Sequence, residues 1–291
     1  LPPRNVGRYA WPVMTKNSIG IIAGGGQFPK LFAEAAQKAG REVVIVAHQG
    51  ESWPELESIA NRFCWVKLGQ LGKIISFFRE HGVTETVFLG AITKTKIFKD
   101  VWPDLKGLTL WNKIDARQDD AILRAVADAL EKEGIHVLES TLYLKDLLFP
   151  KGVLTKKKPS DEQLEDIRFG WQTARAIGAL DIGQCVVVRE RTVLAVEAIE
   201  GTDAAITRGG TLGKEKVVVV KVKKPKQDFR FDLPAIGVKT IETMSAVKAV
   251  VLAVETGQSL LFDREAVIEA ANRAGIVVVG VEELPDGTLS L

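Results

Sequence analysis

Two aspartates with an arginine between them are the residues best suited to chemistry in this sequence. Asp228, Arg230 and Asp232 occupy every second position of residues 228–232. In an extended chain, residues two apart point to the same side, so we expect the three side chains to face together. Two carboxylates and a guanidinium can hold a divalent cation and a phosphoryl oxygen at once. The pattern predicts catalytic, metal-binding Asp228 and Asp232, with Arg230 and Lys226 contacting phosphate. A salt-bridged loop is the alternative.

A second acidic group lies at Glu197 and Asp203. Glu197 follows Val193 and Ala195 at the period of a strand, and a carboxylate on an apolar strand costs free energy to bury unless it is paired. The intervening glycine and threonine lead into a predicted helix, which Thr202 can cap. Glu197 and Asp203 are therefore second candidates for catalytic carboxylates. A strand with one face in water is the alternative for Glu197.

A third polar group opens the predicted helix 121–132. It consists of Asp115, Arg117, Gln118, Asp119 and Asp120. Acids in the first turn complement the positive end of the helix dipole, so a helix start explains the last two residues without a functional role.

Three glycines, Gly24, Gly25 and Gly26, join the apolar run Ile19–Ala23 to a helical pattern. Glycines let the backbone approach a ligand, and the amides at a helix N-terminus attract phosphate. The predicted substrate contacts are Gly24, Gly25, Gly26, Gln27 and Phe28, with His48 at the end of the next predicted strand. A tight strand-to-helix connection without a ligand is the alternative.

Several common site types do not match the sequence. A dinucleotide fingerprint requires a third glycine where Pro29 stands and an acid where His48 and Gln49 stand, which argues against a nicotinamide oxidoreductase. No lysine follows the glycines as in a phosphate-binding P-loop. The chain has three histidines, too few for a histidine-rich dinuclear metal centre.

Apolar strands alternate with amphipathic helices through the first half of the chain. The strands are predicted at Ile19–Ala23, Glu42–Ala47, Arg62–Val66, Thr86–Leu89 and Ile135–Leu138, and the helices at Pro29–Ala39, Leu71–Glu80 and Asp119–Glu133. Glycines 40, 82 and 134 end these helices. The pattern predicts a Rossmann-like, mainly parallel sheet. Residues 24–26, 48–51 and 90–93 should converge at its carboxyl edge.

The second half predicts an α+β domain with a mixed sheet. A capping box at Ser160 and Gln163 starts a helix that reaches about Leu180, and residues 184–199 predict a β-hairpin. The predicted organisation is an N-terminal extension at 1–13, a Rossmann-like nucleotide-binding domain at 14–148, a linker at 149–159, and an α+β domain at 160–291.

Composition is typical of a globular protein that does not bind nucleic acid. Apolar residues make up 46% of the 291 residues, charged residues 26%, and the net charge is only +2. Cys64 and Cys185 lack metal or redox spacing, which is typical of a reducing compartment. The apolar runs are too short to span a bilayer, and the first residues lack the pattern of a secretory signal. We therefore expect a cytoplasmic protein.

Three blocks together resemble a known family. They are residues 21–29, 197–203 and 226–237. In this order they are similar to the LpxI-type UDP-2,3-diacylglucosamine pyrophosphatases, and the likeness runs from about Ser18 to Val281.

The resemblance implies Mg²⁺-dependent hydrolysis of the pyrophosphate bond in UDP-2,3-diacylglucosamine. The products would be UMP and 2,3-diacylglucosamine 1-phosphate (lipid X), a step of lipid A biosynthesis. It implies a nucleotide-linked lipid substrate, with residues 160–291 as the catalytic and lipid-substrate domain. It also implies transient membrane-surface contact, peripheral at the inner membrane, and a homodimer is possible. A non-catalytic nucleotide-sugar-binding regulatory protein is the alternative.

Overall fold

The structure is a computed structural model that describes residues 17–92, 102–111, 119–225, 227–231 and 233–291. The predicted extension at 1–13 lies outside the described residues. Contacts divide the chain into two units, residues 1–143 and residues 144–291, and each unit is described by itself.

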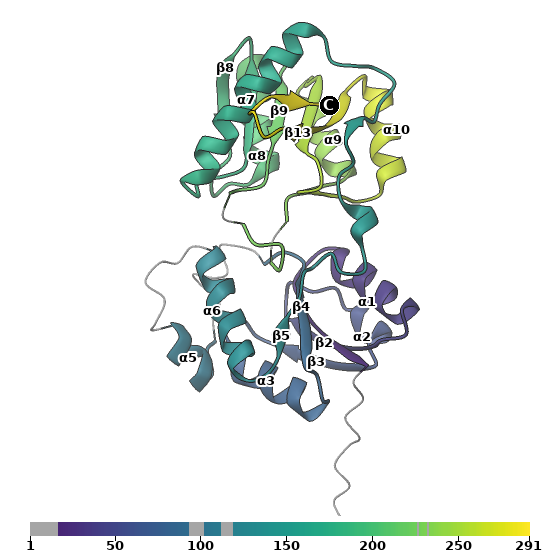
Figure 1. The fold of residues 1–291 in the computed structure, drawn as a ribbon, viewed down its shortest axis with the longest axis vertical. Coiled ribbons are helices and arrows are strands. Elements are labelled where there is room, and N and C mark those ends of the chain that lie inside the picture. Colours follow the sequence, from purple (N-terminus) through teal and green to yellow (C-terminus); the bar gives the residue numbers. More distant parts are fainter. Residues whose placement is uncertain (1–16, 93–101, 112–118, 226, 232) are drawn as a thin grey trace, which may run out of the picture. The chain divides into compact units, whose positions relative to one another are not determined.

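The described strands of the first unit form a parallel sheet in the order β3-β2-β1-β4-β5 (Figure 1). Their bounds are β1 Ser18–Ala23, β2 Glu42–His48, β3 Arg62–Val66, β4 Glu85–Leu89 and β5 His136–Val137. The predicted Rossmann-like parallel sheet is therefore confirmed. The strand order reverses between β1 and β4, which is the position where ligands bind in open sheets of this kind.

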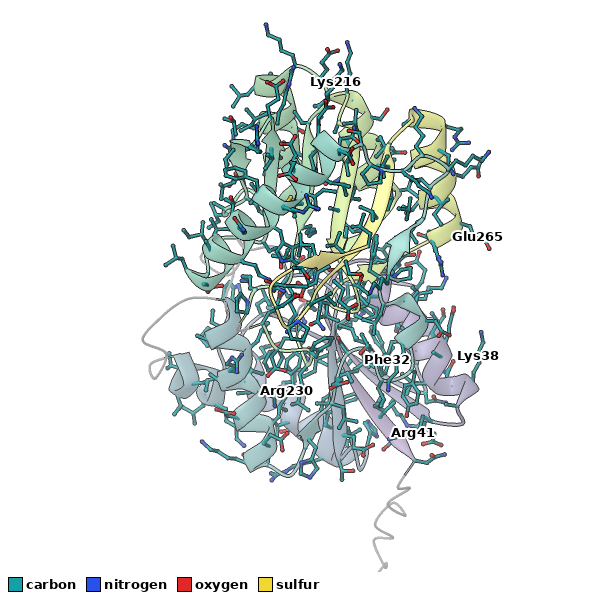
Figure 2. All side chains as sticks on the ribbon, turned by 45° about the horizontal axis from the view of Figure 1, so that its top comes forward. Phe32, Lys38, Arg41, Lys216, Arg230 and Glu265 are labelled. Atoms are coloured by element: carbon teal, nitrogen blue, oxygen red, sulfur yellow. The ribbon has the colours of Figure 1, made fainter. Side chains whose placement is uncertain are left out.

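Helices cover both faces of this sheet. They are α1 Phe28–Lys38, α2 Leu56–Ile59, α3 Leu71–Glu80, α5 Leu105–Trp111 and α6 Asp119–Lys132. In Figure 1, α1 and α2 lie on one side of the sheet and α3 and α6 on the other. Phe32 on α1 is fully buried against the sheet and is labelled in Figure 2. Gly40, Gly82 and Gly134 follow α1, α3 and α6 with φ of 81°, 64° and 78°, which confirms their predicted role in ending the helices.

The second unit contains a mixed sheet, as predicted. Its strands are β6 Gly152–Val153, β7 Cys185–Arg189, β8 Thr192–Val196, β9 Val218–Lys221, β11 Val251–Glu255, β13 Val277–Glu283 and β14 Leu289–Ser290. Strands β9, β11 and β13 are parallel, whereas β7 is antiparallel to both β9 and β8. The predicted hairpin is thus confirmed, although its second strand ends at Val196. Short strands β10 Ala235–Ile236 and β12 Leu260–Leu261 form a separate pair.

Alternating valines divide the core of the second unit between the two faces of the sheet. Val186, Val218 and neighbouring valines pack with Ile167 and Trp171 from α7 Asp161–Ala179. The opposite face packs against α8 Thr202–Gly213, α9 Val238–Ala246 and α10 Arg264–Ala274. The helix α7 begins with the predicted capping box, since the Ser160 Oγ accepts from the Gln163 amide at 3.3 Å and the Gln163 Oε1 accepts from the Ser160 amide at 3.0 Å. A 3₁₀ turn at Lys145–Leu147 precedes these elements.

The strand directions bring polar residues to one edge of the second sheet. Because β7 is antiparallel to both neighbours, β8 runs in the same direction as β9, β11 and β13. The ends of these four strands therefore share an edge, which we call the carboxyl edge. The residues at or just after these ends are Glu197, Lys221, Glu255 and Glu283.

Candidate active site

Glu197 lies at the carboxyl edge directly after β8 and is only 8% exposed. Its carboxylate is paired: Oε1 accepts from Thr202 Oγ1 at 2.8 Å, and Oε2 accepts from the Gln184 amide at 3.4 Å. The water-facing alternative is therefore wrong. The expected capping of α8 by Thr202 is wrong. The N-cap is Gly201, and the Thr202 hydroxyl donates to Glu197 instead.

Asp203 lies in the first turn of α8, with Oδ2 3.2 Å from Lys239 Nζ on α9. Cys185 lies at the same edge, where β7 begins opposite Lys221. Burial raises the pKa of the Cys185 thiol, and the negative charges of Glu197 and Asp203 raise this pKa further. The thiol thus stays protonated at neutral pH and is a poor nucleophile.

Asp228 and Arg230 lie in the segment after β9, and the expected extended geometry is wrong. The Phe231 amide donates to the Asp228 carbonyl at 3.1 Å, and the Arg230 amide donates to Asp228 Oδ1 at 3.0 Å. The chain therefore turns at Asp228, because an aspartate carboxylate readily accepts from the backbone two residues on. Asp232 and Lys226 lie outside the described residues.

The Arg230 guanidinium faces the Asp228 carboxylate, as the salt-bridged-loop alternative predicts. Arg230 Nη2 is 2.8 Å from Asp228 Oδ2, and Nε is 3.1 Å from the same oxygen. The two side chains remain 32% and 20% exposed, so an anionic ligand can reach the guanidinium from solvent. Arg230 is labelled in Figure 2.

The described residues do not form a complete cation site. Within them, no group of three or more histidines, cysteines, aspartates or glutamates could hold a metal. Asp228 offers one carboxylate, which is an oxygen ligand of the kind that Mg²⁺ prefers. Mg²⁺ is commonly bound by one or two carboxylates together with substrate phosphates, so these residues fit a cation shared with a bound diphosphate.

Lys221 is a residue that sequence analysis missed. It ends β9 and is only 5% exposed, and its Nζ donates to the Ala235 carbonyl at 3.1 Å. This contact joins the two ends of residues 222–234, the stretch that contains Asp228 and Arg230. A lysine is almost never buried without a specific reason. The sequence contains a signal that could have identified Lys221, because the other residues of β9 are all valines.

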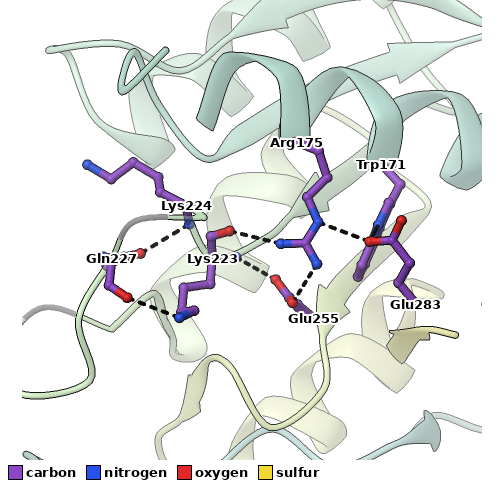
Figure 3. A network of polar contacts seen from close by, with 7 residues as sticks. All are labelled: Trp171, Arg175, Lys223, Lys224, Gln227, Glu255 and Glu283. Carbon is purple, nitrogen blue, oxygen red and sulfur yellow. Dashed lines mark hydrogen bonds and ion pairs between the residues drawn. The ribbon is translucent and has the colours of Figure 1, made fainter. Parts of the chain in front are cut away.

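A polar network extends along the carboxyl edge beside this segment (Figure 3). Arg175 from α7 contacts Glu255 at the end of β11 and Glu283 at the end of β13, at 2.8 and 3.2 Å. The Lys223 amide donates to the same Glu255 carboxylate at 2.7 Å. No sequence motif indicated these residues, because the partners lie up to 108 positions apart.

In the first unit, the glycine turn contacts the loop after β4. The Gly24 amide donates to the Leu89 carbonyl at 2.8 Å, and the Gly25 amide donates to the Ala91 carbonyl at 2.7 Å. A Cβ on Gly24 would lie 2.6 Å from the Ala91 oxygen, so the glycine allows this close backbone approach. The tight-connection alternative therefore accounts for the glycine at position 24. Gly26 is exposed with φ of 88°.

His48 ends β2 beside this turn. Its Nδ1 is 2.9 Å from the Ala23 carbonyl, to which Ser52 Oγ also donates at 2.7 Å. Burial lowers the pKa of His48, so the ring is neutral at pH 7. Because Nδ1 faces a carbonyl, we assign its proton there, which leaves Nε2 as an acceptor. The predicted convergence of the turn with residues 48–51 and 90–92 is thus confirmed, while Thr93 lies outside the described residues.

Only part of the third polar group lies within the described residues. Residues 115, 117 and 118 lie outside the described residues, and Asp119 and Asp120 begin α6, as expected of first-turn acids.

The fold is that of a two-unit α/β protein, with a candidate site of acidic and basic residues on its second unit. Residues 18–147 match the LpxI N-terminal domain, and residues 150–279 match the LpxI C-terminal domain. The chain therefore belongs to the LpxI family. It is 37% identical over 275 residues to the UDP-2,3-diacylglucosamine pyrophosphatase LpxI of Caulobacter vibrioides, covering 91% of this chain and 97% of that protein.

Similarity to solved structures is distant. N5-carboxyaminoimidazole synthetase from Staphylococcus aureus, complexed with ADP, is 15% identical with a TM-score of 0.24, covering 71% of this chain and 47% of that chain. N5-carboxyaminoimidazole ribonucleotide synthetase from Thermotoga maritima is 14% identical with a TM-score of 0.22, covering 64% and 43%. The chain matches less than half the length of these two structures.

Proposed function

We propose that this chain hydrolyses the pyrophosphate bond of UDP-2,3-diacylglucosamine, giving UMP and lipid X in lipid A biosynthesis. The observation that carries this proposal is the 37% identity, over 91% of the chain, to a pyrophosphatase named for that substrate. Asp228 and Arg230, in the segment after β9, support the proposal, since they combine a carboxylate with a guanidinium.

In this proposal Arg230 binds a phosphate oxygen, and Asp228 supplies the carboxylate. A phosphate oxygen competes with Asp228 for the Arg230 guanidinium, because both anions suit its planar fork. Arg230 and Lys226 then offset phosphate charge, and the released carboxylate is available either to bind the cation or to accept the proton of the attacking water. Water forms a new bond to phosphorus as the bridging P–O bond breaks, and the two phosphate monoesters leave. Glu197 and Asp203 are the second candidates for this role.

The proposed cofactor is Mg²⁺, or another divalent cation. Asp228 and Asp232 would hold it, and when bound it would shield the phosphoryl oxygens and lower the pKa of a bound water. The uridine nucleotide is proposed to contact residues 24–28 and His48. Because the Gly24 and Gly25 amides already bind carbonyls, the contact falls mainly on Gly26, Gln27 and Phe28.

Removing the cation tests both the cofactor and catalysis itself. With UDP-2,3-diacylglucosamine and Mg²⁺ we expect steady UMP release, which excess EDTA stops and added Mg²⁺ restores. An EDTA-insensitive rate would reject the cation and leave hydrolysis standing. Substrate binding without UMP release, under every metal condition, would instead identify the non-catalytic nucleotide-sugar-binding regulator.

A diacylated substrate resides in a membrane, and we propose that the protein is cytoplasmic and contacts this surface transiently. No helix among the described residues is long and apolar enough to cross a membrane. The proposal is supported by three apolar side chains at and before α5. Trp102, Leu105 and Leu108 are 64%, 82% and 45% exposed, and Lys67 Nζ lies 4.6 Å from the centre of the Trp102 ring.

The Asp104 side chain holds the start of α5 against the start of α3. Its carboxylate accepts from the Gly107 amide at 2.9 Å and from the Lys73 amide at 3.0 Å, and it thereby caps both α5 and α3. The apolar side chains are therefore presented by an anchored helix.

Charge placed on α5 should weaken membrane binding. We expect Leu105→Glu to reduce co-sedimentation with vesicles containing anionic lipid several-fold, because it places a carboxylate at the apolar contact. Leu212→Glu is the matched control, since Leu212 is 63% exposed on α8. Equal binding by wild type and both variants would reject α5 as the contact.

A further inference from the structure

We infer that Glu255 and Arg175 are a positioning pair for the segment that contains Asp228 and Arg230. The reaction that this pair serves rests on the proposed function, whereas its effect on the segment does not. Neither residue belongs to the predicted site.

Glu255 joins the base of the segment to the sheet. It ends β11 and is 8% exposed. Its Oε2 accepts from the Lys223 amide at 2.7 Å, while Oε1 accepts from Arg175 Nη2 at 2.8 Å (Figure 3). Both oxygens therefore have charge-assisted or backbone partners, and the carboxylate is oriented for holding Lys223.

Arg175 is itself held from several sides. Its Nε donates to Glu283 at 3.2 Å, and the guanidinium carbon lies 5.2 Å from the centre of the Trp171 ring. The Trp171 Nε1 donates to the same Glu283 carboxylate at 3.1 Å. The remaining arm of Arg175, Nη1, donates to the Lys223 carbonyl at 3.2 Å. Glu255 and Arg175 together thus bind both the amide and the carbonyl of Lys223.

Lys223 transmits this constraint toward Asp228. Its Nζ donates to the Gln227 carbonyl at 3.0 Å and lies 4.7 Å from the centre of the Phe229 ring. Gln227 is 4% exposed, and its Oε1 accepts from the Lys224 amide at 3.3 Å. A continuous set of contacts therefore extends from β11 and α7 to the residue that precedes Asp228.

Such a pair affects the rate through geometry. Displacement of a reacting group by about 1 Å can reduce a rate about 100-fold. Because the Glu255 carboxylate is buried and has its partners within the protein, its loss should change turnover more than substrate affinity.

The test uses the full chain with Glu255→Gln, Arg175→Lys and the control Glu269→Gln. In Glu255→Gln the new amide presents its NH2 group either to Arg175 or to the Lys223 amide, so it cannot reproduce both contacts, whereas Arg175→Lys keeps the positive charge without the planar fork. Glu269 pairs with Arg273 on α10 at 2.9 Å in an exposed ion pair of the same unit. Each protein is assayed for kcat, KM, melting temperature and amide hydrogen exchange.

We expect kcat to fall about 10- to 100-fold in the two variants with KM within about threefold. Hydrogen exchange should accelerate in peptides covering residues 222–231 and stay unchanged in the rest of the second unit. Unchanged exchange in this segment would overturn the inference, and so would faster exchange spread evenly over the unit. Because exchange is measured without substrate, it decides the inference even if the wild-type protein releases no UMP.

Discussion

Replacing Asp228 with alanine should lower the turnover of UDP-2,3-diacylglucosamine about 10²- to 10⁴-fold. This is the typical contribution of a positioned acid–base group. Among the described residues of the predicted site, Asp228 has its carboxylate beside the Arg230 guanidinium. Its side chain is 20% exposed, so substrate and water can reach it. The measurement is kcat at saturating substrate and Mg²⁺, with the melting temperature determined in parallel.

The salt-bridged-loop alternative makes a different prediction for the same variant. If Asp228 serves only to pair with Arg230, its loss should destabilise the protein by about 0–1 kcal/mol and leave turnover intact. Asp228→Asn serves as the control, because an amide oxygen still accepts from the Arg230 backbone amide while the charge is removed. Turnover of Asp228→Asn close to wild type would show that the carboxylate charge has no catalytic role.

Asp232→Ala should reduce turnover by the same factor, about 10²- to 10⁴-fold. This expectation comes from the sequence, in which Asp232 is the second acid of the pair and directly precedes Leu233 and Pro234. Substrate binding should survive, since nucleotide contacts are assigned to the first unit. The variant should therefore retain labelled substrate in equilibrium dialysis while releasing almost no UMP.

The two aspartate variants also decide between the acidic groups. If both turn over substrate within about tenfold of wild type, which corresponds to about 1.4 kcal/mol, the assignment to Asp228 and Asp232 is wrong. Glu197 and Asp203 then become the candidates.

Features set by local pattern were predictable from the sequence. Apolar runs of strand length and glycines that end helices gave the parallel sheet of the first unit and most of the element bounds. The helix Leu71–Glu80 was predicted with the bounds that the structure has. The capping box at Ser160 was equally predictable, because its two hydrogen bonds join residues three apart.

The site depends on contacts that no local pattern encodes. Arg175 and Glu255 lie 80 positions apart, and they meet because α7 packs across the strands near the carboxyl edge. The turn at Asp228 was missed for another reason. The Asp228 carboxylate accepts from the Arg230 amide and bends a segment whose alternating pattern is typical of an extended chain. Gly24 matched a phosphate-binding pattern, but its missing side chain lets the loop after β4 approach.

Identification of the products formed from UDP-2,3-diacylglucosamine by the wild-type chain tests the central claim most directly. In the presence of Mg²⁺, mass spectrometry should detect UMP and 2,3-diacylglucosamine 1-phosphate in equal amounts that increase linearly with enzyme concentration. Cleavage that yields UDP instead, or intact substrate after prolonged incubation with protein that binds it, would contradict the proposed pyrophosphatase activity.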